Sequence, residues 1–267
     1  MGKIIGIVSG KGGVGKTTTT TNLGVALRKL GKKVCVFDAN ITTSNLGLHL
    51  GITDYPVTSH ELLKSKKLGD SIYVHHSGLR IIPGSLSLDD AKALNISNLK
   101  QVLTNLAKKY DFVLVDGAPG IDREALSVVE ASDEVIVVTN PEMPAITDAI
   151  KIIEVAKRNN AKVRGVVVNK RRNKDYELTA QEIESAAGVP ILGTVPEDEN
   201  VLRAISEKSP VVFARERSPA ARSFSKIAAD IAGVEFNDSL DIMSMLKRIF
   251  LGTPQKPEIE KLTEAEQ

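Results

Sequence analysis

Residues 10–17 read Gly-Lys-Gly-Gly-Val-Gly-Lys-Thr, which satisfies the phosphate-loop pattern G-x-x-x-x-G-K-[ST]. An apolar run at residues 4–8 precedes this stretch, and residues 17–30 follow it with helical spacing. Strand, glycine-rich loop and helix therefore occur in the order that a polyphosphate site requires, because backbone N–H groups and the helix N-terminus then face the phosphates. A glycine-rich turn that binds nothing is the alternative. Such a turn would not need every constrained residue of the phosphate-loop pattern between a strand and a helix.

The loop predicts a site for a nucleoside triphosphate and its magnesium ion. We expect Lys16 to reach the β- and γ-phosphates and the Thr17 hydroxyl to ligate the Mg²⁺ that bridges them. The nucleotide-binding candidates in this segment are Gly10, Lys11, Gly12, Gly13, Val14, Gly15, Lys16, Thr17 and Thr18.

Composition narrows the class of protein. A chain of 267 residues can bury one substantial α/β core, and its 35 basic and 33 acidic side chains leave a net charge of +2, too small to indicate nucleic-acid binding by itself. The single cysteine, Cys35, excludes an internal disulfide and a cysteine-ligated cluster held by one chain. The first strand starts at once without a signal peptide, and no run approaches transmembrane length, so we expect a cytoplasmic protein.

Apolar segments alternate with helical ones along the chain, which predicts an α/β fold with a mostly parallel central sheet covered by helices on both faces. The further predicted strands are residues 34–38, 79–83, 112–116, 134–139, 162–169 and 191–195. Ligands of such sheets bind beyond the carboxyl ends of the strands. We expect one ATPase domain over residues 1–233, a linker and amphipathic helix over 234–252, and a disordered tail over 253–267.

Asp116 ends the predicted strand 112–116 and is followed by Gly117-Ala118-Pro119-Gly120. An acid at this position can hold a water of the Mg²⁺, and the glycines suit a loop that senses the γ-phosphate. An ordinary strand-end residue that starts a turn is the alternative.

The strand 34–38 ends Phe37-Asp38-Ala39-Asn40, and the phosphate loop begins with Lys11 after its first glycine. Together these features resemble the deviant-Walker ATPases of the MinD and ParA group, in which the strand ends Asp-x-Asp and the loop starts Lys-Gly-Gly. The resemblance covers residues 1 to about 233. It implies a P-loop NTPase that binds and hydrolyses ATP with Mg²⁺.

The resemblance also implies that Lys11 crosses an interface to the phosphates of a second subunit, so that ATP drives formation of a homodimer. Chemically, a second fixed cation can neutralise charge on the phosphoryl oxygens, as an arginine finger does. A solvated surface lysine is the alternative.

Asn40 departs from the family pattern, which has an aspartate there that is thought to orient the attacking water. An amide can hydrogen-bond a water but cannot take its proton, so we expect slow hydrolysis and a faster Asn40→Asp variant. Asp38 matches the first family acid. The catalytic candidates are Lys11, Lys16, Asp38 and Asn40, and the metal-binding candidates are Thr17, Asp38 and Asp116.

Asn169 ends the predicted strand 162–169, and in the resembled family this asparagine contacts the adenine base. Its amide offers a donor and an acceptor to a base edge. Pro196, Glu197 and Asp198 resemble the segment that lines the other side of the adenine pocket, where backbone groups are able to do the reading.

Residues 239–252 carry an amphipathic pattern near the C-terminus, and its ending resembles the membrane-targeting helix of MinD proteins. The membrane-binding candidates are the apolar Ile242, Met243, Leu246, Ile249 and Phe250 with the basic Lys247 and Arg248. One such helix binds lipid reversibly, and pairing two in an ATP dimer increases avidity. We therefore expect peripheral attachment to the inner face of the cell membrane. A final helix packed on its own domain is the alternative.

The leading interpretation is a MinD-like ATPase that positions an unidentified protein partner, as in septum-site determination during cell division. A ParA-type partition ATPase that binds DNA is a rival, with candidate basic clusters at Lys170, Arg171, Arg172 and Lys174 or at Arg215, Arg217 and Arg222. A nucleotide-gated scaffold with little catalysis is a further alternative. An iron–sulfur carrier would need paired cysteines.

Overall fold

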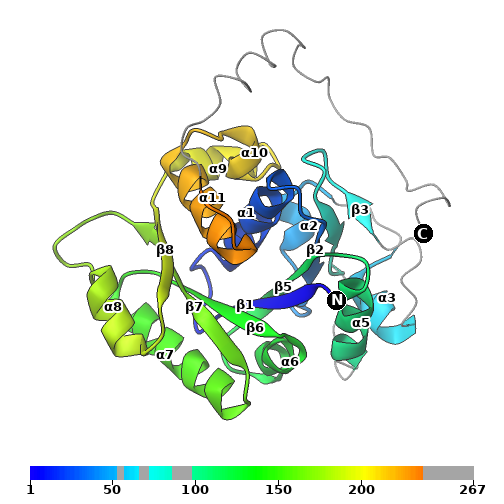
Figure 1. The fold of residues 1–267 in the computed structure, drawn as a ribbon, viewed down its shortest axis with the longest axis horizontal. Helices are drawn as coiled ribbons and strands as arrows, with labels where there is room; N and C mark the ends of the chain where they lie inside the picture. The colour runs from blue at the N-terminus through cyan, green and yellow to red at the C-terminus, as the bar shows by residue number, and fades with distance from the viewer. Residues whose placement is uncertain (53–56, 66–71, 86–97, 237–267) are drawn as a thin grey trace, which may run out of the picture.

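The computed structural model describes residues 1–52, 57–65, 72–85 and 98–236, and within these ranges the strands form one sheet in the order β3-β4-β2-β5-β1-β6-β7-β8 (Figure 1). The strands are β1 Lys3–Ser9, β2 Val34–Asp38, β3 Tyr73–Val74, β4 Arg80–Ile82, β5 Phe112–Pro119, β6 Glu134–Thr139, β7 Lys162–Arg171 and β8 Ile191–Pro196. All neighbours pair in parallel except β3, which is antiparallel to β4.

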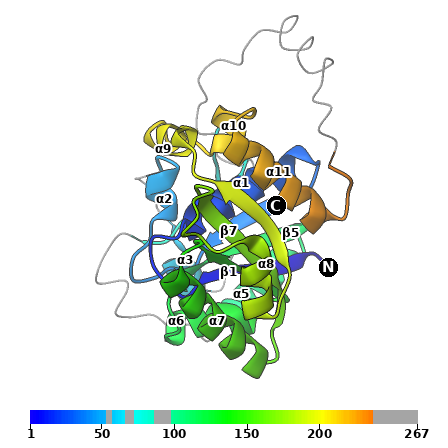
Figure 2. The same cartoon turned by 90° about the vertical axis from the view of Figure 1, so that its left-hand side faces the viewer.

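Helices cover both faces of this sheet, as Figures 1 and 2 show. The helices are α1 Lys16–Lys29, α2 Leu46–His49, α3 Ser59–Ser65, α5 Leu99–Ala107, α6 Arg123–Ala131, α7 Met143–Arg158, α8 Ala180–Ala187, α9 Glu199–Ser206, α10 Val211–Ala214 and α11 Pro219–Ala232. One apolar core joins the sheet to α3 and α5–α8, and a second joins it to α1, α2 and α9–α11. The predicted α/β fold with a mostly parallel sheet is confirmed.

Predicted and observed strands agree best in the centre of the sheet, where β2 and β6 have the predicted bounds. The predicted strand 79–83 is shorter in the structure, and β5, β7 and β8 each extend beyond the predicted end. The antiparallel strand β3 was not predicted. It has two residues, too few to produce an apolar pattern, and among the strands that the structure describes it pairs only with β4, at the sheet edge.

The sheet register brings the two predicted acids together. Asp38 at the end of β2 lies opposite Asp116 on β5, and Ile7 of β1 lies opposite Asp116 from the other side. Because parallel strands end at the same edge, the phosphate loop after β1 and the loop at residues 39–45 after β2 open at one place.

Two polar clusters connect elements of the fold, one between neighbouring strands and one between the sheet edge and a helical segment. Glu134, 5% exposed at the start of β6, accepts hydrogen bonds from Lys162 at 2.6 Å and Arg164 at 3.1 Å and pairs with Lys3 at 3.3 Å. The buried His75, between β3 and β4, holds the segment between α9 and α10, since its Nε2 donates to the Lys208 carbonyl at 3.0 Å.

The last described helix, α11, starts at Pro219 after the capping side chain of Ser218 and ends before Gly233, whose φ of 67° suits glycine. The amphipathic segment at residues 239–251, with every membrane-binding candidate, lies outside the described residues, and the domain boundary near residue 233 stays a prediction. Among the helices that the structure describes, none is long and apolar enough to span a membrane.

Candidate nucleotide site

The phosphate loop forms one wall of a cavity of about 770 Å³ at the carboxyl edge of the sheet. The loop after β2 contributes Asn40 and Thr43 to its lining, and the β7 end contributes Asn169 and Lys170. A third wall is formed by residues 196–199 and by apolar side chains of α9, which include Leu202 at 70% exposure. The predicted phosphate-loop residues other than Gly10 and the predicted base-binding residues therefore face a single cavity.

Two glycines of the loop are required by close contacts. A Cβ on Gly10 would lie 2.1 Å from the Asp148 carbonyl oxygen of α7, and Gly15 combines a φ of 92° with the Asn169 amide 2.2 Å from the position of its missing Cβ. In contrast, nothing lies within 4 Å of a Cβ built on Gly12 or Gly13, so that part of the loop is open to a ligand.

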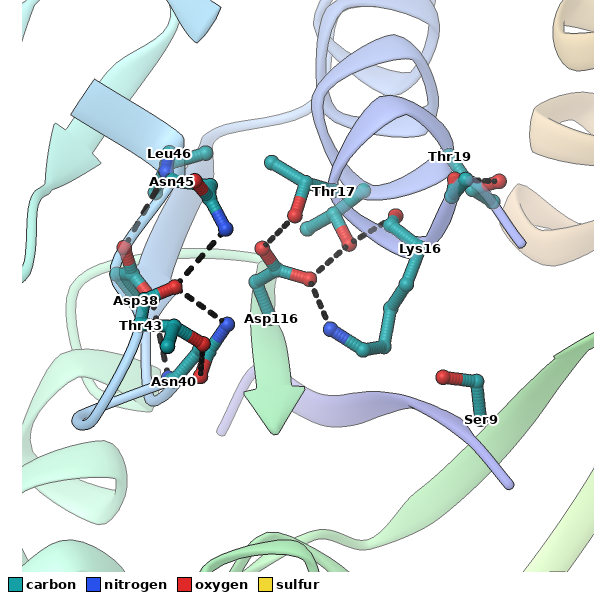
Figure 3. A network of polar contacts seen from close by, with 12 residues as sticks. Ser9, Lys16, Thr17, Thr19, Asp38, Asn40, Thr43, Asn45, Leu46 and Asp116 are labelled. Carbon is teal, nitrogen blue, oxygen red and sulfur yellow. Dashed lines mark hydrogen bonds and ion pairs between the residues drawn. The ribbon is translucent and has the colours of Figure 1, made fainter. Parts of the chain in front are cut away.

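Lys16 and Thr17 meet Asp116 at the base of the site (Figure 3). The Lys16 ammonium lies 3.3 Å from Asp116 Oδ1, and the Thr17 hydroxyl donates to Oδ2 at 2.6 Å. Thr20, one turn along α1, also donates to Oδ1, at 3.3 Å. Lys16 and Asp116 are both buried, so each charge is balanced by the other rather than by water.

Asp38 is buried beside Asp116 and is held by its own loop. It accepts hydrogen bonds from the Ser44 hydroxyl at 2.6 Å and from the Asn40 backbone N–H at 3.0 Å. Burial, together with the charge of Asp116, raises the pKa of Asp38 to about 7 against the opposing effect of these hydrogen bonds and of Lys16. The two acids therefore favour a cation between or beside them.

Asn40 does not point its amide freely into the cavity. Its Nδ2 donates to the Thr43 carbonyl at 2.7 Å, and its Oδ1 accepts from the Thr43 hydroxyl at 3.0 Å (Figure 3). The neighbouring Thr42 donates through its hydroxyl to Glu124 of α6. Neither Thr43 nor Glu124 was predicted to hold this loop, because the turn that brings Thr43 to Asn40 and the contact of Thr42 with Glu124, 82 positions away, appear only in the folded chain.

Asn169 and Lys170 bind the phosphate loop from β7. The Asn169 amide nitrogen donates to the Val14 carbonyl at 2.8 Å, and the Lys170 ammonium donates to the Gly13 carbonyl at 2.7 Å. With its donor directed at Val14, Asn169 keeps its Oδ1 as the acceptor for a ligand, which suits an amino group on a base edge.

The other predicted base-binding residues lie between β8 and α9. Asp198 caps α9 by accepting from the Asn200 N–H at 2.9 Å and also accepts from the Ala220 N–H at 3.2 Å, so its carboxylate serves the local fold. Glu197 forms a two-pronged ion pair with Arg172 at the cavity rim. Pro196, Glu197 and Asp198 all line the cavity, but the two carboxylates already have protein partners, and the role of this segment toward a base stays a prediction.

Comparison with known proteins supports the prediction of the family. The ParA family model, described as NUBPL iron-transfer P-loop NTPase, matches residues 1–232. A structure of the septum site-determining protein MinD from Pyrococcus horikoshii with Mg-ADP superposes with a TM-score of 0.82 and 35% identity, covering 86% of this chain and 96% of that one. The chain belongs to the MinD/ParA family of P-loop ATPases.

Two further proteins are similar to the chain over most of its length. An uncharacterized ATP-binding protein of Methanocaldococcus jannaschii is 39% identical over 237 residues, 88% of this chain and 90% of the relative. The MinC:MinD cell division protein complex of Aquifex aeolicus contains a chain with a TM-score of 0.78 and 28% identity, with 88% and 98% coverage.

Iron transfer, which the family model's description mentions, does not fit the thiol chemistry of this member of the MinD/ParA family. Cys35 is buried in β2, and burial raises the pKa of its thiol to about 12. A thiol held protonated inside the sheet is a poor cluster ligand, because ligation requires the thiolate.

The basic clusters considered for DNA binding are partly paired in this MinD/ParA chain. Arg171 donates to the Leu178 carbonyl, Arg172 pairs with Glu197, and Arg215 pairs with Glu207. The ion pairs of Arg172 and Arg215 lower the positive charge that these clusters offer to a phosphate backbone, whereas the hydrogen bond from Arg171 to a neutral carbonyl leaves its charge unchanged.

Proposed function

We propose that the chain is a MinD-type switch that binds ATP with Mg²⁺, dimerises in that state, attaches reversibly to membrane and positions another protein, with slow hydrolysis. The observation that carries this proposal is the coexistence of a complete phosphate loop, an exposed Lys11 on the cavity rim and an Asn40 side chain bound to Thr43. The phosphate loop thus supplies the groups that bind a nucleotide, whereas the Asn40 side chain is not free to activate a water.

The residues around Asp116 fit a magnesium nucleotide. The Thr17 hydroxyl and the carboxylates of Asp116 and Asp38 are oxygen ligands of the kind that Mg²⁺ prefers, and the first two lie within 2.6 Å of each other. Thr17 would hold the metal directly and the acids through water. Bound Mg²⁺ neutralises charge on phosphoryl oxygens during transfer.

The protein's own groups divide the remaining work. Lys16 is poised to exchange its ion pair with Asp116 for the β- and γ-phosphates, since both partners sit at the loop. Asn169 presents an acceptor to the adenine amino group through Oδ1. Lys11, whose side chain is exposed, would reach the phosphates of a second copy.

Slow hydrolysis follows from the loop at residues 39–45. Orientation of an attacking water by Asn40 requires its amide to leave two hydrogen bonds with Thr43, and an amide accepts no proton. A long-lived ATP state gives time for membrane attachment through residues 239–251. The septum site-determining relatives and the MinC:MinD complex support a role in placing a partner at the septum or another membrane site.

Analytical ultracentrifugation of the full chain with Mg·ATP tests the switch. We expect a dimer with ATP and a monomer with ADP, and Lys11→Gln should remain monomeric while still binding a fluorescent ATP analogue. Lys33→Gln, which removes an exposed lysine between α1 and β2, is the matched control and should dimerise normally. A Lys11→Gln chain that still dimerises with ATP would refute the role of Lys11.

A further inference from the structure

The backbone of β7 is irregular where it meets the phosphate loop. Val168 pairs with Thr194 and Arg171 with Pro196, so β7 contains one more residue than β8 between these two pairs. Lys170 lies in this bulge with a φ of 56°, a left-handed conformation that costs a residue other than glycine about 1 kcal/mol. Bulges of this kind re-aim side chains next to functional sites.

The bulge turns two consecutive side chains toward one loop. In a regular strand, neighbouring side chains point to opposite faces of the sheet. Here Asn169 donates to the Val14 carbonyl at 2.8 Å, and Lys170 donates to the Gly13 carbonyl at 2.7 Å. Two adjacent residues of β7 thereby hold two adjacent peptide groups of the phosphate loop.

Fixing these carbonyls also fixes the N–H groups on the other side of each planar peptide. A Gly13 carbonyl directed at Lys170 turns the Val14 N–H away from β7, and a Val14 carbonyl directed at Asn169 does the same for Gly15. Gly12 and Gly13 have no side chains and open space around them, so little packing restrains this part of the loop. The hydrogen bond from Lys170 supplies a restraint that packing does not.

We propose that Lys170 is a positioning residue for the ATPase reaction, which preorganises the phosphate loop by holding the Gly13 peptide. Its ammonium acts through the loop backbone and not as a further phosphate ligand. This inference rests on the nucleotide-binding part of the proposed function, and ATP binding by the unmodified chain tests that part separately.

The variant Lys170→Asn isolates this role, because asparagine tolerates the left-handed conformation but is too short to reach Gly13. Lys170→Arg retains a long cationic donor. Lys208→Asn is the matched control, since Lys208 is a lysine with the same left-handed backbone, at a φ of 57°, but it is exposed and does not line the cavity. Lys170→Gly relieves the strained backbone and removes the ammonium.

The measurements are the Kd for a fluorescent ATP analogue with Mg²⁺, the KM and kcat for ATP, and the melting temperature. For Lys170→Asn we expect Kd and KM to rise about tenfold, because the loop loses one hydrogen bond from a charged donor. Its melting temperature should stay within about 3 °C of that of the unmodified chain, which corresponds to a change of about 1 kcal/mol or less in the free energy of unfolding. Lys170→Arg should recover most of the affinity, Lys208→Asn should bind ATP normally, and Lys170→Gly should lose affinity without losing stability.

Two results would overturn the inference. The first is a Kd of Lys170→Asn for ATP within about twofold of the Kd of the unmodified chain, a difference of less than about half a kcal/mol in binding free energy. The second is a parallel fall of affinity and melting temperature in both Lys170→Asn and Lys170→Gly, which would assign the lysine a structural role only. If the unmodified chain itself binds no ATP, the proposed function fails before Lys170 is tested.

Discussion

The substitution Asn40→Asp addresses the reason for slow hydrolysis. It changes one amide to a carboxylate and so removes the 2.7 Å hydrogen bond from Nδ2 to the Thr43 carbonyl, placing an oxygen against an oxygen. A hydrogen bond of this type contributes about 1 kcal/mol, and the new repulsion acts in the same direction. One of the two hydrogen bonds that hold the side chain is therefore lost, and the remaining one, donated by the Thr43 hydroxyl, is the weaker restraint against turning toward the cavity.

The new carboxylate can accept a hydrogen bond from the attacking water and, unlike the amide, its proton. Removing a restraint of about 1.4 kcal/mol from the reactive arrangement corresponds to about a tenfold increase in kcat. A third carboxylate close to Asp38 and Asp116 should also destabilise the chain without nucleotide, lowering the melting temperature by about 2–4 °C per kcal/mol.

Phosphate release at saturating Mg·ATP measures the effect. Asn40→Ala also removes the contacts with Thr43 but supplies no carboxylate, so its rate should not exceed that of the unmodified chain. The reasoning is refuted if Asn40→Asp hydrolyses ATP within about twofold of the unmodified rate, or if Asn40→Ala is accelerated equally.

Three further predictions concern stability. The pKa of Glu134 is lowered to about 2, since hydrogen bonds from two lysines and an arginine outweigh its burial, so the stability that it contributes is present above pH 4.5 and is lost as the pH falls toward 2. Urea titrations should show this loss, and Glu134→Gln should make the slope smaller without removing it, because other carboxylates also have lowered pKa values. The pKa of His75 is lowered to about 4 by burial and by the adjacent histidine, so stability should also fall as the pH drops from 6.5 to 4, and a His75→Asn chain that keeps the unmodified slope in this range would contradict the assignment. Gly10→Ala should lower the free energy of unfolding by at least about 3 kcal/mol, because its Cβ would lie 2.1 Å from the Asp148 carbonyl oxygen. Gly12→Ala, with open space around its Cβ, should lower it by less than about 1 kcal/mol. Equal melting temperatures of the two variants would count against this contrast.

Patterns local in sequence predicted the fold and the position of the site. The pattern at residues 10–17 predicted the loop together with the strand before it and the helix after it. Because parallel strands end at the same edge of a sheet, Asp116 was then expected beside that loop. The apolar runs of the central strands are long enough to be recognised because both faces of the sheet are covered. The two-residue strand β3 offers no such run.

Contacts that depend on the folded path of the backbone were not predictable in the same way. Thr43 satisfies both ends of the Asn40 amide, which only the folded loop reveals. Lys170 had the sequence context of a basic surface cluster, and its contact with Gly13 depends on a bulge between β7 and β8 that no residue pattern indicates. Such bonds depend on the folded path of a loop or on the register of two strands, and local composition does not reveal either.

The most direct test of the proposed membrane switch is co-sedimentation with anionic liposomes, with duplex DNA as the competing surface. The full chain and a truncation ending at Asn237 are compared with Mg·ATP and with Mg·ADP. We predict that only the full chain with ATP sediments with lipid, because pairing two weak membrane helices requires the dimer. Lipid binding that is independent of ATP or of residues 238–267, or retention of both chains on DNA alone, would contradict the account.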